Sequence, residues 1–173
     1  MDIVEFNDVY DKNRKLTGKV HRRGTHWHLG EFGLVVCVWV HDGKGNLLLT
    51  RRASGKSYAG TWENTGGAVK AGESSRQAIA RELFEETGIR AKDEEFELID
   101  CNRSRNFHFD HYCLKKEIPI EQIKLLPGET DGVQWASLEK VSQMVRDGKI
   151  CKIIGRQFHR QYGEILKRQS AQS

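Results

Sequence analysis

The sequence predicts a layered domain of the α/β (α+β) class. Short runs rich in apolar and β-branched residues alternate with helical stretches, which is typical of strands packed against helices. Turn signals separate these runs, and no Pro-, Gly- or Ser-rich linker interrupts them. The 173 residues give room for one hydrophobic core of ordinary size. We therefore expect a single domain over residues 1–173.

Hairpins account for the strands expected in the first third of the chain. Residues 8–20 read as two short extended pieces around a polar turn, within an N-terminal extension over residues 1–30. Residues 33–40 and 47–52 flank the sequence DGKGN at 42–46, which is a strong turn signal. Further strands are expected at residues 96–101, 107–114 and 133–136.

Three helices are expected, at residues 74–87, at 137–146, and at 151–168 within a C-terminal helix and tail over 151–173. The first helix has local signals at both ends. Ser74 and Gln77 have the spacing of a capping box, and Gly88 stands where a left-handed residue commonly ends a helix. Apolar residues recur at nearly helical period in the third helix, so one of its faces should pack on the domain.

Composition argues against several classes of protein. Hydrophobic and charged residues make up 38% and 30% of the chain, as in folded globular proteins. The net charge of +4 is too small and too scattered to indicate nucleic-acid binding, and no apolar run is long enough to span a membrane. Residues 1–5 lack the pattern of a secretory signal. The four cysteines have neither CxxC nor zinc spacing, so we expect reduced thiols and a cytoplasmic location.

An acidic face is the most informative feature of the helix at 74–87. Glu82, Glu85 and Glu86 are spaced i, i+3 and i+4, so their carboxylates share one face near the C-terminal end, where the helix dipole favours cations. Two carboxylates about 6 Å apart repel by roughly 3 kcal/mol at an effective dielectric of 20, but by less than about 1 kcal/mol in water. A solvated acidic face therefore stays open as an interpretation. The alternative is a site for Mg²⁺ or Mn²⁺, which prefer clustered carboxylate oxygens.

The segment from Gly67 to Ile89 resembles the signature of the Nudix hydrolase family, G-x5-E-x7-R-E-U-x-E-E-x-G-U, where U is apolar. Every fixed position of the signature is matched, by Gly67, Glu73, Arg81, Glu82, Leu83, Glu85, Glu86, Gly88 and Ile89. The resemblance implies a Nudix-type α/β/α sandwich with a mixed β-sheet and a loop–helix–loop metal site. The N-terminal hairpin and the C-terminal helix would be additions to this sandwich.

The resemblance also implies roles for the signature residues. A divalent cation, Mg²⁺ or Mn²⁺, would neutralise the charge of a diphosphate and lower the pKa of a bound water. The implied metal ligands are Glu82, Glu85, Glu86 and the carbonyl of Gly67. The implied structural residues are Glu73, Arg81 and Gly88.

The expected reaction is metal-dependent hydrolysis of a phosphoanhydride bond in a small molecule. The substrate would be a nucleoside diphosphate linked to another group, or a free nucleoside di- or triphosphate. Glu82 is our candidate general base. Glu129, in a polar loop, is the alternative, although a solvated loop charge explains Glu129 equally well.

Candidate substrate-binding residues lie before the signature. Arg51 and Arg52 end a strand, and because side chains alternate along a strand, one of the two should face the site. A guanidinium there suits phosphate, while a solvated arginine pair is the competing interpretation. Lys56 and Tyr58 belong to the following loop and could close on the substrate.

A wider resemblance, over about residues 8–135, is to the Nudix branch that contains type I isopentenyl diphosphate isomerase. At the positions of that enzyme's acid/base cysteine and metal-binding histidine, this chain has Gly66 and Ala68. Isomerisation is therefore disfavoured but kept as an alternative. A non-catalytic nucleotide sensor is the third hypothesis, which loss of a signature glutamate would favour. We allow for a homodimer, although nothing in the sequence fixes the oligomeric state.

Overall fold

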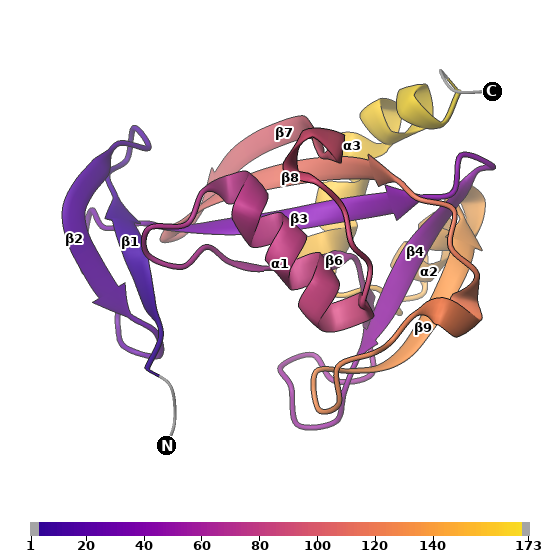
Figure 1. Cartoon of the computed structure of the whole chain (residues 1–173), viewed down its shortest axis with the longest axis horizontal. Coiled ribbons are helices and arrows are strands. Elements are labelled where there is room, and N and C mark those ends of the chain that lie inside the picture. Colours follow the sequence, from indigo (N-terminus) through magenta and orange to yellow (C-terminus); the bar gives the residue numbers. More distant parts are fainter. Residues whose placement is uncertain (1–3, 171–173) are drawn as a thin grey trace.

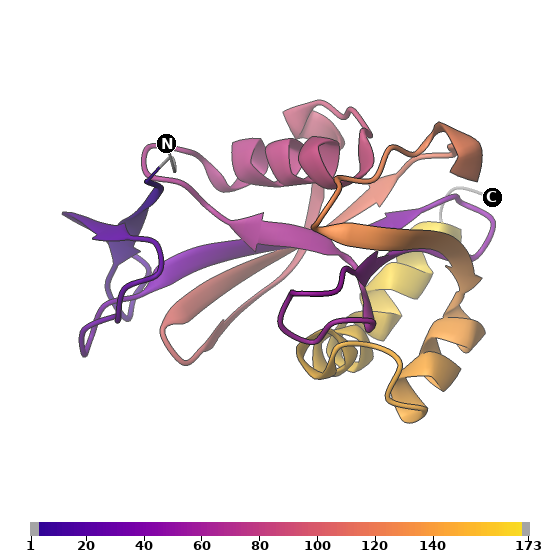
Figure 2. The same cartoon turned by 90° about the horizontal axis from the view of Figure 1, so that it is seen from below.

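The computed structural model describes residues 4–170 and is built on a mixed sheet of seven strands (Figure 1). Helix α1 (Ser75–Thr87) covers one face of the sheet, while α2 (Leu138–Arg146) and α3 (Lys152–Ser170) cover the other (Figure 2). A separate hairpin of β1 (Phe6–Tyr10) and β2 (Leu16–Arg22) lies at one end. The sheet strands are β3 (Gly33–His41), β4 (Asn46–Arg52), β5 (Trp62–Glu63), β6 (Thr65–Ala68), β7 (Glu97–Ser104), β8 (Phe107–Lys115) and β9 (Thr130–Ser137), and 3-10 turns span Asp93–Glu95 and Ile120–Gln122. The predicted class and its three layers are confirmed.

The sheet divides along β3. One edge of β3 pairs in parallel with β8 over its whole length, from Gly33↔Phe107 to His41↔Lys115. Its other edge first pairs with β6, with Cys37 opposite Gly66, and then meets β4 at His41↔Leu47. Strand β4 itself pairs with β5 and β9. The chain therefore crosses between β5 and β6 from the edge of β4 to the edge of β3.

Alternation along β3 separates two hydrophobic clusters. Val36 and Val38 point toward α1 and pack in the cluster that contains its buried Ile79 and Leu83. Trp39 points the opposite way, into a cluster with Leu47, Leu49 and Cys113 of the sheet and Phe158 and Ile165 of α3. Its indole donates a 2.8 Å hydrogen bond to Gln161. Each face of the sheet is thus fixed to its own helices.

The expected helices agree with the structure within about two residues at each end. Ser74 caps α1 and exchanges hydrogen bonds with Gln77, and Gly88 follows with a φ of 73°, as the sequence predicts. The sequence did not predict β5 and β6, and β9 is longer than expected. Residues 1–3 of the predicted extension and 171–173 of the predicted tail lie outside the described residues.

The N-terminal hairpin is fastened to the loop that precedes α1. Ala71 donates its amide to the carbonyl of Phe6 at 2.8 Å, and the Asn7 side chain donates to the carbonyl of Val69 at 2.7 Å. The Asp8 carboxylate accepts the amide of Gly72 at 2.8 Å. The hairpin therefore helps to set the position of this loop. Among residues 4–170, no helix combines the length and apolar character needed to cross a membrane.

Candidate active site

A polar cavity of about 310 Å³ lies beside the C-terminal half of α1. Its acidic lining residues are Glu5, Glu82, Glu85, Glu86 and Glu129, and its basic ones are Arg23, Arg52, Lys56 and Arg81. Backbone from Gly66 to Ala68, in β6, forms another wall. The helical spacing predicted the three glutamates of α1 on one face, and the fold brings Glu129 and Arg52 to the same cavity.

Arg81 organises the acidic side of this cavity. Its Nε and Nη2 atoms donate to the two carboxylate oxygens of Glu73 at 2.8 and 2.9 Å. Its Nη1 atom donates to Glu82 at 2.7 Å and to Glu85 at 3.2 Å. Such a planar fork of donors cannot be reproduced by a lysine. Arg81 and Glu73 therefore hold the loop before α1 against the helix.

Glu82 is held on its other side by the main chain of β6. A β-carbon added at Gly67 would overlap the carboxylate of Glu82. At Gly66 it would overlap the carbonyl oxygen of Val36, because β6 pairs there with β3. Both glycines are therefore needed for close packing, and the Glu82 carboxylate lies directly against the strand.

Ion pairs neutralise most charges around the cavity. Arg23 pairs with Glu5, and Lys56 pairs with Glu129. Arg52 donates to both carboxylate oxygens of Glu63 at 2.7 Å, on the adjacent strand β5. With Arg81 shared among its own glutamates, each basic residue of the cavity already has an acidic partner.

Glu86 is the exception. Within residues 4–170 its carboxylate makes neither a hydrogen bond nor an ion pair. Burial raises the pKa of Glu86 well above its ordinary value, and the nearby charges of Glu82, Glu63 and Glu129 raise it further. Burial also raises the pKa of Glu82, although the hydrogen bond from Arg81 opposes this. The carboxylates that line the cavity thus outnumber its basic side chains, two of which are also shared with Glu63 and Glu73.

This surplus of carboxylate oxygen fits a divalent cation. Mg²⁺ and Mn²⁺ prefer such hard oxygen donors, and either ion would supply a positive charge next to the Glu86 carboxylate. In the described part of the chain, no three His, Cys, Asp or Glu side chains are already arranged as a complete metal site. Arg81 engages both Glu82 and Glu85, while Glu86 of the same helix face stays free of it.

The candidate substrate-binding residues separate into two groups. Arg52 and Lys56 line the glutamate cavity. Arg51 lies on the opposite side of β4, where it pairs with Asp131 at 2.6 Å and covers the ring of Trp62, so the structure does not bring it to the cavity. One arginine of the pair thus faces the site, in keeping with strand alternation.

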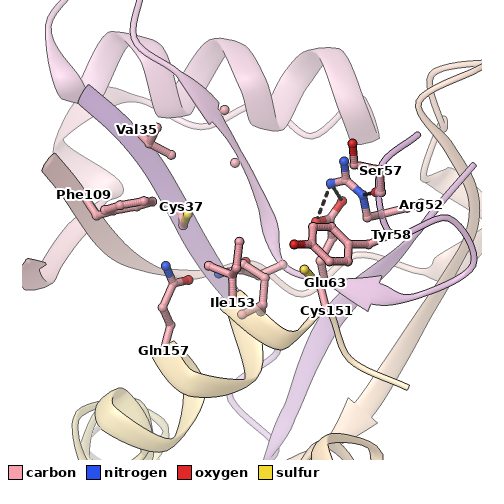
Figure 3. Close-up of a pocket in the computed structure, with 14 residues that line it drawn as sticks. Val35, Cys37, Arg52, Ser57, Tyr58, Glu63, Phe109, Cys151, Ile153 and Gln157 are labelled. Atoms are coloured by element: carbon pink, nitrogen blue, oxygen red, sulfur yellow. Dashed lines mark hydrogen bonds and ion pairs between the residues drawn. The ribbon is translucent and has the colours of Figure 1, made fainter. Parts of the chain in front are cut away.

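Tyr58 belongs to a second cavity, of about 220 Å³, on the face of the sheet that carries α3 (Figure 3). Tyr58 is half exposed, and its φ of 59° is unusual for a residue other than glycine. The two cavities share Arg52, Gly66 and Gly67. They therefore adjoin at β6.

Sequence reasoning missed three charged residues near the cavity. Glu5 and Arg23 directly flank the strands of the N-terminal hairpin, and Glu63, the partner of Arg52, comes from β5. No local pattern marks them, because they approach the glutamates through pairing between distant segments. The hydrogen bonds between the hairpin and the loop before α1 explain why Glu5 and Arg23 lie near the glutamates.

A model of the NUDIX domain matches residues 31–152, which is well over half of the chain. The chain belongs to the Nudix family. The match spans the whole glutamate face, Arg52 and Glu129, while the N-terminal hairpin and most of α3 lie outside it. Enzymes of this family hydrolyse nucleotide-linked compounds, so the chain is a Nudix hydrolase by membership.

Sequence similarity to other proteins agrees with membership of the Nudix family. An uncharacterised Nudix hydrolase of Listeria innocua is 31% identical over 156 residues, covering 84% of this chain and 88% of that protein. A CTP pyrophosphohydrolase of Escherichia coli is 47% identical over 58 residues, covering 34% of this chain and 42% of that one. An isopentenyl-diphosphate Delta-isomerase of Pectobacterium atrosepticum is 28% identical over 144 residues, covering 78% of each.

A solved structure shares the fold. The crystal structure of a Deinococcus radiodurans protein aligns with a TM-score of 0.77 over 91% of this chain and 99% of that one. The two sequences are 20% identical, so this likeness concerns the fold. The aligned share of the chain is larger than the segment matched by the domain model, so the likeness extends beyond residues 31–152.

Proposed function

We propose that this Nudix hydrolase cleaves a phosphoanhydride bond in a nucleoside diphosphate linked to another group, or in a nucleoside di- or triphosphate, with Mg²⁺ or Mn²⁺ bound at the glutamate face. The observation that supports this most strongly is the carboxylate of Glu86, which has no partner among residues 4–170 and lies close to Glu82, Glu85 and Glu129. A bound cation would balance that charge and attract a polyphosphate to the same place.

The residues of the chain divide the work as follows. Glu82, Glu85, Glu86 and the carbonyl of Gly67 would hold the cation, which supplies neutralising charge to the diphosphate. Arg52 and Lys56 would bind phosphate oxygens at the opposite wall, where guanidinium and ammonium donors are already in place. Arg81 and Glu73 fix the glutamates relative to β6. Positioning and electrostatics then carry most of the rate enhancement.

Glu82 is our proposed general base, because burial raises its pKa and because Arg81 and Gly67 fix its carboxylate. Glu129 stays the alternative, since it lines the same cavity from the loop before β9. The two differ in their place in the fold. Glu82 belongs to helix α1 and Glu129 to a loop, which makes Glu82 the better positioned of the two.

Isomerisation of a prenyl diphosphate is less well supported. Gly66 leaves no room for a cysteine side chain, because its β-carbon would overlap the carbonyl of Val36. The thiol nearest to that position is Cys37, whose pKa burial raises to about 12, so it stays protonated and is poorly suited to acid/base exchange. Cys113 is buried in the hydrophobic cluster on the α3 face of the sheet. A sensor role lacks support as well, since all signature glutamates are present.

The test is a metal-supplemented screen of nucleotides, nucleotide sugars, dinucleotides and isopentenyl diphosphate, with products identified by mass. We expect release of a nucleoside phosphate that stops when EDTA is added. Glu86→Gln and Glu82→Gln should each lower kcat by roughly two orders of magnitude with the fold unchanged. Glu139→Gln, at an exposed position of α2, is the matched control. Full activity of both cavity variants, or turnover insensitive to EDTA, would overturn the proposal.

We also infer that the chain forms one domain, because hydrogen bonds join the hairpin to the loop before α1. A cytoplasmic location is inferred from the four free thiols, of Cys37, Cys101, Cys113 and Cys151, since a reducing compartment preserves such thiols. Measuring the thiol content of protein purified without reductant would test this inference.

A further inference from the structure

The second cavity has mostly apolar walls. It lies between β3, β8 and the first turns of α3, and Val35, Phe109 and Ile153 line it (Figure 3). Tyr58 lies at its edge near Arg52. At about 220 Å³ it is smaller than the roughly 300–1,000 Å³ that hold a whole ligand. It is therefore suited to one part of a substrate whose remainder lies elsewhere.

Two amide side chains in this apolar wall have polar atoms that lack partners in the described part of the chain. Asn64 is 3% exposed and Gln157 is 8% exposed. Neither polar atom of the Asn64 amide forms a hydrogen bond within residues 4–170, and the Gln157 Oε1 atom forms none either. Buried polar groups in proteins are nearly always hydrogen-bonded, so groups without partners call for an explanation. A bound molecule that completes these hydrogen bonds provides one.

The positions of both amides are set by rigid elements. Asn64 stands where the chain crosses from β5 to β6, between the edge of β4 and the edge of β3. Gln157 lies in the second turn of α3, next to Phe158, which is fully buried. Side chains on such elements are held in place before a ligand arrives, which favours specific recognition.

Arg52 connects this cavity with the glutamate cavity. Its guanidinium is held by Glu63 at 2.7 Å and by the carbonyl of Ser57 at 2.6 Å. It lines both cavities, as do Gly66 and Gly67. A substrate with phosphate in the glutamate cavity could thus place its uncharged end beneath β6, against α3.

We propose that this second cavity binds a flat heterocyclic ring with hydrogen-bonding edges, of the nucleobase class, and that Asn64 and Gln157 read its edge. This proposal rests on the proposed function and names the part of the substrate that decides its specificity. Each amide offers a donor and an acceptor, which match the edge of a base. Phe109 and the apolar wall suit the faces of the ring. A prenyl chain would leave both amides without partners, a mismatch that strongly disfavours binding.

The test uses the four common ribonucleosides, which carry no phosphate, in the absence of metal. We expect ligand-observed NMR to detect binding of at least one of them to the intact protein. Gln157→Leu should weaken that binding about 3- to 10-fold, and Gln157→Glu, which keeps the side-chain size, should weaken it too.

Stability separates recognition from a structural role. Because Gln157 Oε1 has no partner among the residues that the structure describes, Gln157→Leu should leave Tm unchanged or raise it by a few degrees. Gln169→Leu is the matched control: it lies on the same helix, is 5% exposed, donates to the carbonyl of Asn46 at 3.4 Å and lines neither cavity. It should not raise Tm and should bind the nucleoside normally.

The proposal is overturned if none of the four nucleosides binds, or if they bind equally well to wild type and Gln157→Leu. A large drop in Tm for Gln157→Leu would also contradict it, since that result would mean the amide stabilises the fold. Failure of the proposed function is a different result. In that case no diphosphate is hydrolysed, while nucleoside binding is still judged on its own.

Discussion

The carboxylate of Glu82 occupies the space that a β-carbon at Gly67 would need, so that no side chain fits at position 67 without displacing it. Gly67→Ala should therefore change the position of the Glu82 carboxylate relative to that of Glu86. We expect kcat to fall by roughly 10- to 100-fold, since small misplacements of catalytic groups are costly. Circular dichroism and Tm should stay close to wild type, because the displaced atoms are the far end of a side chain.

Gly163→Ala is the control for that substitution. Gly163 lies in α3 with nothing within 4 Å of an added β-carbon. Since alanine favours helix more than glycine, this variant should be slightly more stable and fully active. Equal activity of the two alanine variants would mean that the position of Glu82 does not matter for turnover.

Arg51 and Arg52 are adjacent arginines with opposite orientations, which makes them a matched pair. Arg52→Ala should lower kcat/KM by roughly 10-fold or more, because it removes the guanidinium shared by both cavities. Arg51→Ala removes a surface pair with Asp131, so its activity should stay within about threefold of wild type. Steady-state kinetics on the same substrate decides the matter. A larger loss for Arg51→Ala would show that the orientation seen here is not the functional one.

His111 predicts how stability depends on pH. It is fully buried, its Nε2 atom lies 2.6 Å from Asn102, and burial lowers its pKa to about 4. The unfolded chain binds a proton at this histidine near pH 6.5, so lowering the pH from 6.5 toward 4 favours unfolding. The contribution of neutral His111 to the free energy of unfolding is fully present above pH 6.5, and about 3 kcal/mol of it is lost by pH 4.

Urea unfolding of wild type and His111→Gln at pH 7 and pH 4.5 measures this term. The variant should be less sensitive to acid, because it has no imidazole to protonate when it unfolds. Carboxylates titrate in both proteins and cancel in the comparison. The same loss of stability in both proteins would contradict the assignment.

Local chemistry explains why α1 and its glutamate face could be predicted. Ser74, Gln77 and Gly88 act within one or two turns of the helix, and helical period alone places Glu82, Glu85 and Glu86 together. Strand β6 could not be predicted, because Thr65-Gly66-Gly67-Ala68 has little strand propensity and forms only by pairing with distant β3.

The second cavity also could not be predicted from the sequence, because segments far apart in the chain form it. Gln157 occupies a helix whose apolar period is carried by Ile154 and Phe158, so a glutamine between them looks like an ordinary exposed residue. Asn64 has the appearance of a loop residue. Only the crossing of the chain between two strands, together with the packing of α3 on the sheet, buries both amides.

Binding of Mn²⁺ to the substrate-free protein tests the central claim, that the carboxylate of Glu86 completes a divalent-cation site. Electron paramagnetic resonance titration gives the affinity without any need for a known substrate. We predict saturable binding by the wild type, at least about 10-fold weaker binding by Glu86→Gln, and unchanged binding by Glu139→Gln. Equal Mn²⁺ affinity in wild type and Glu86→Gln would contradict the account.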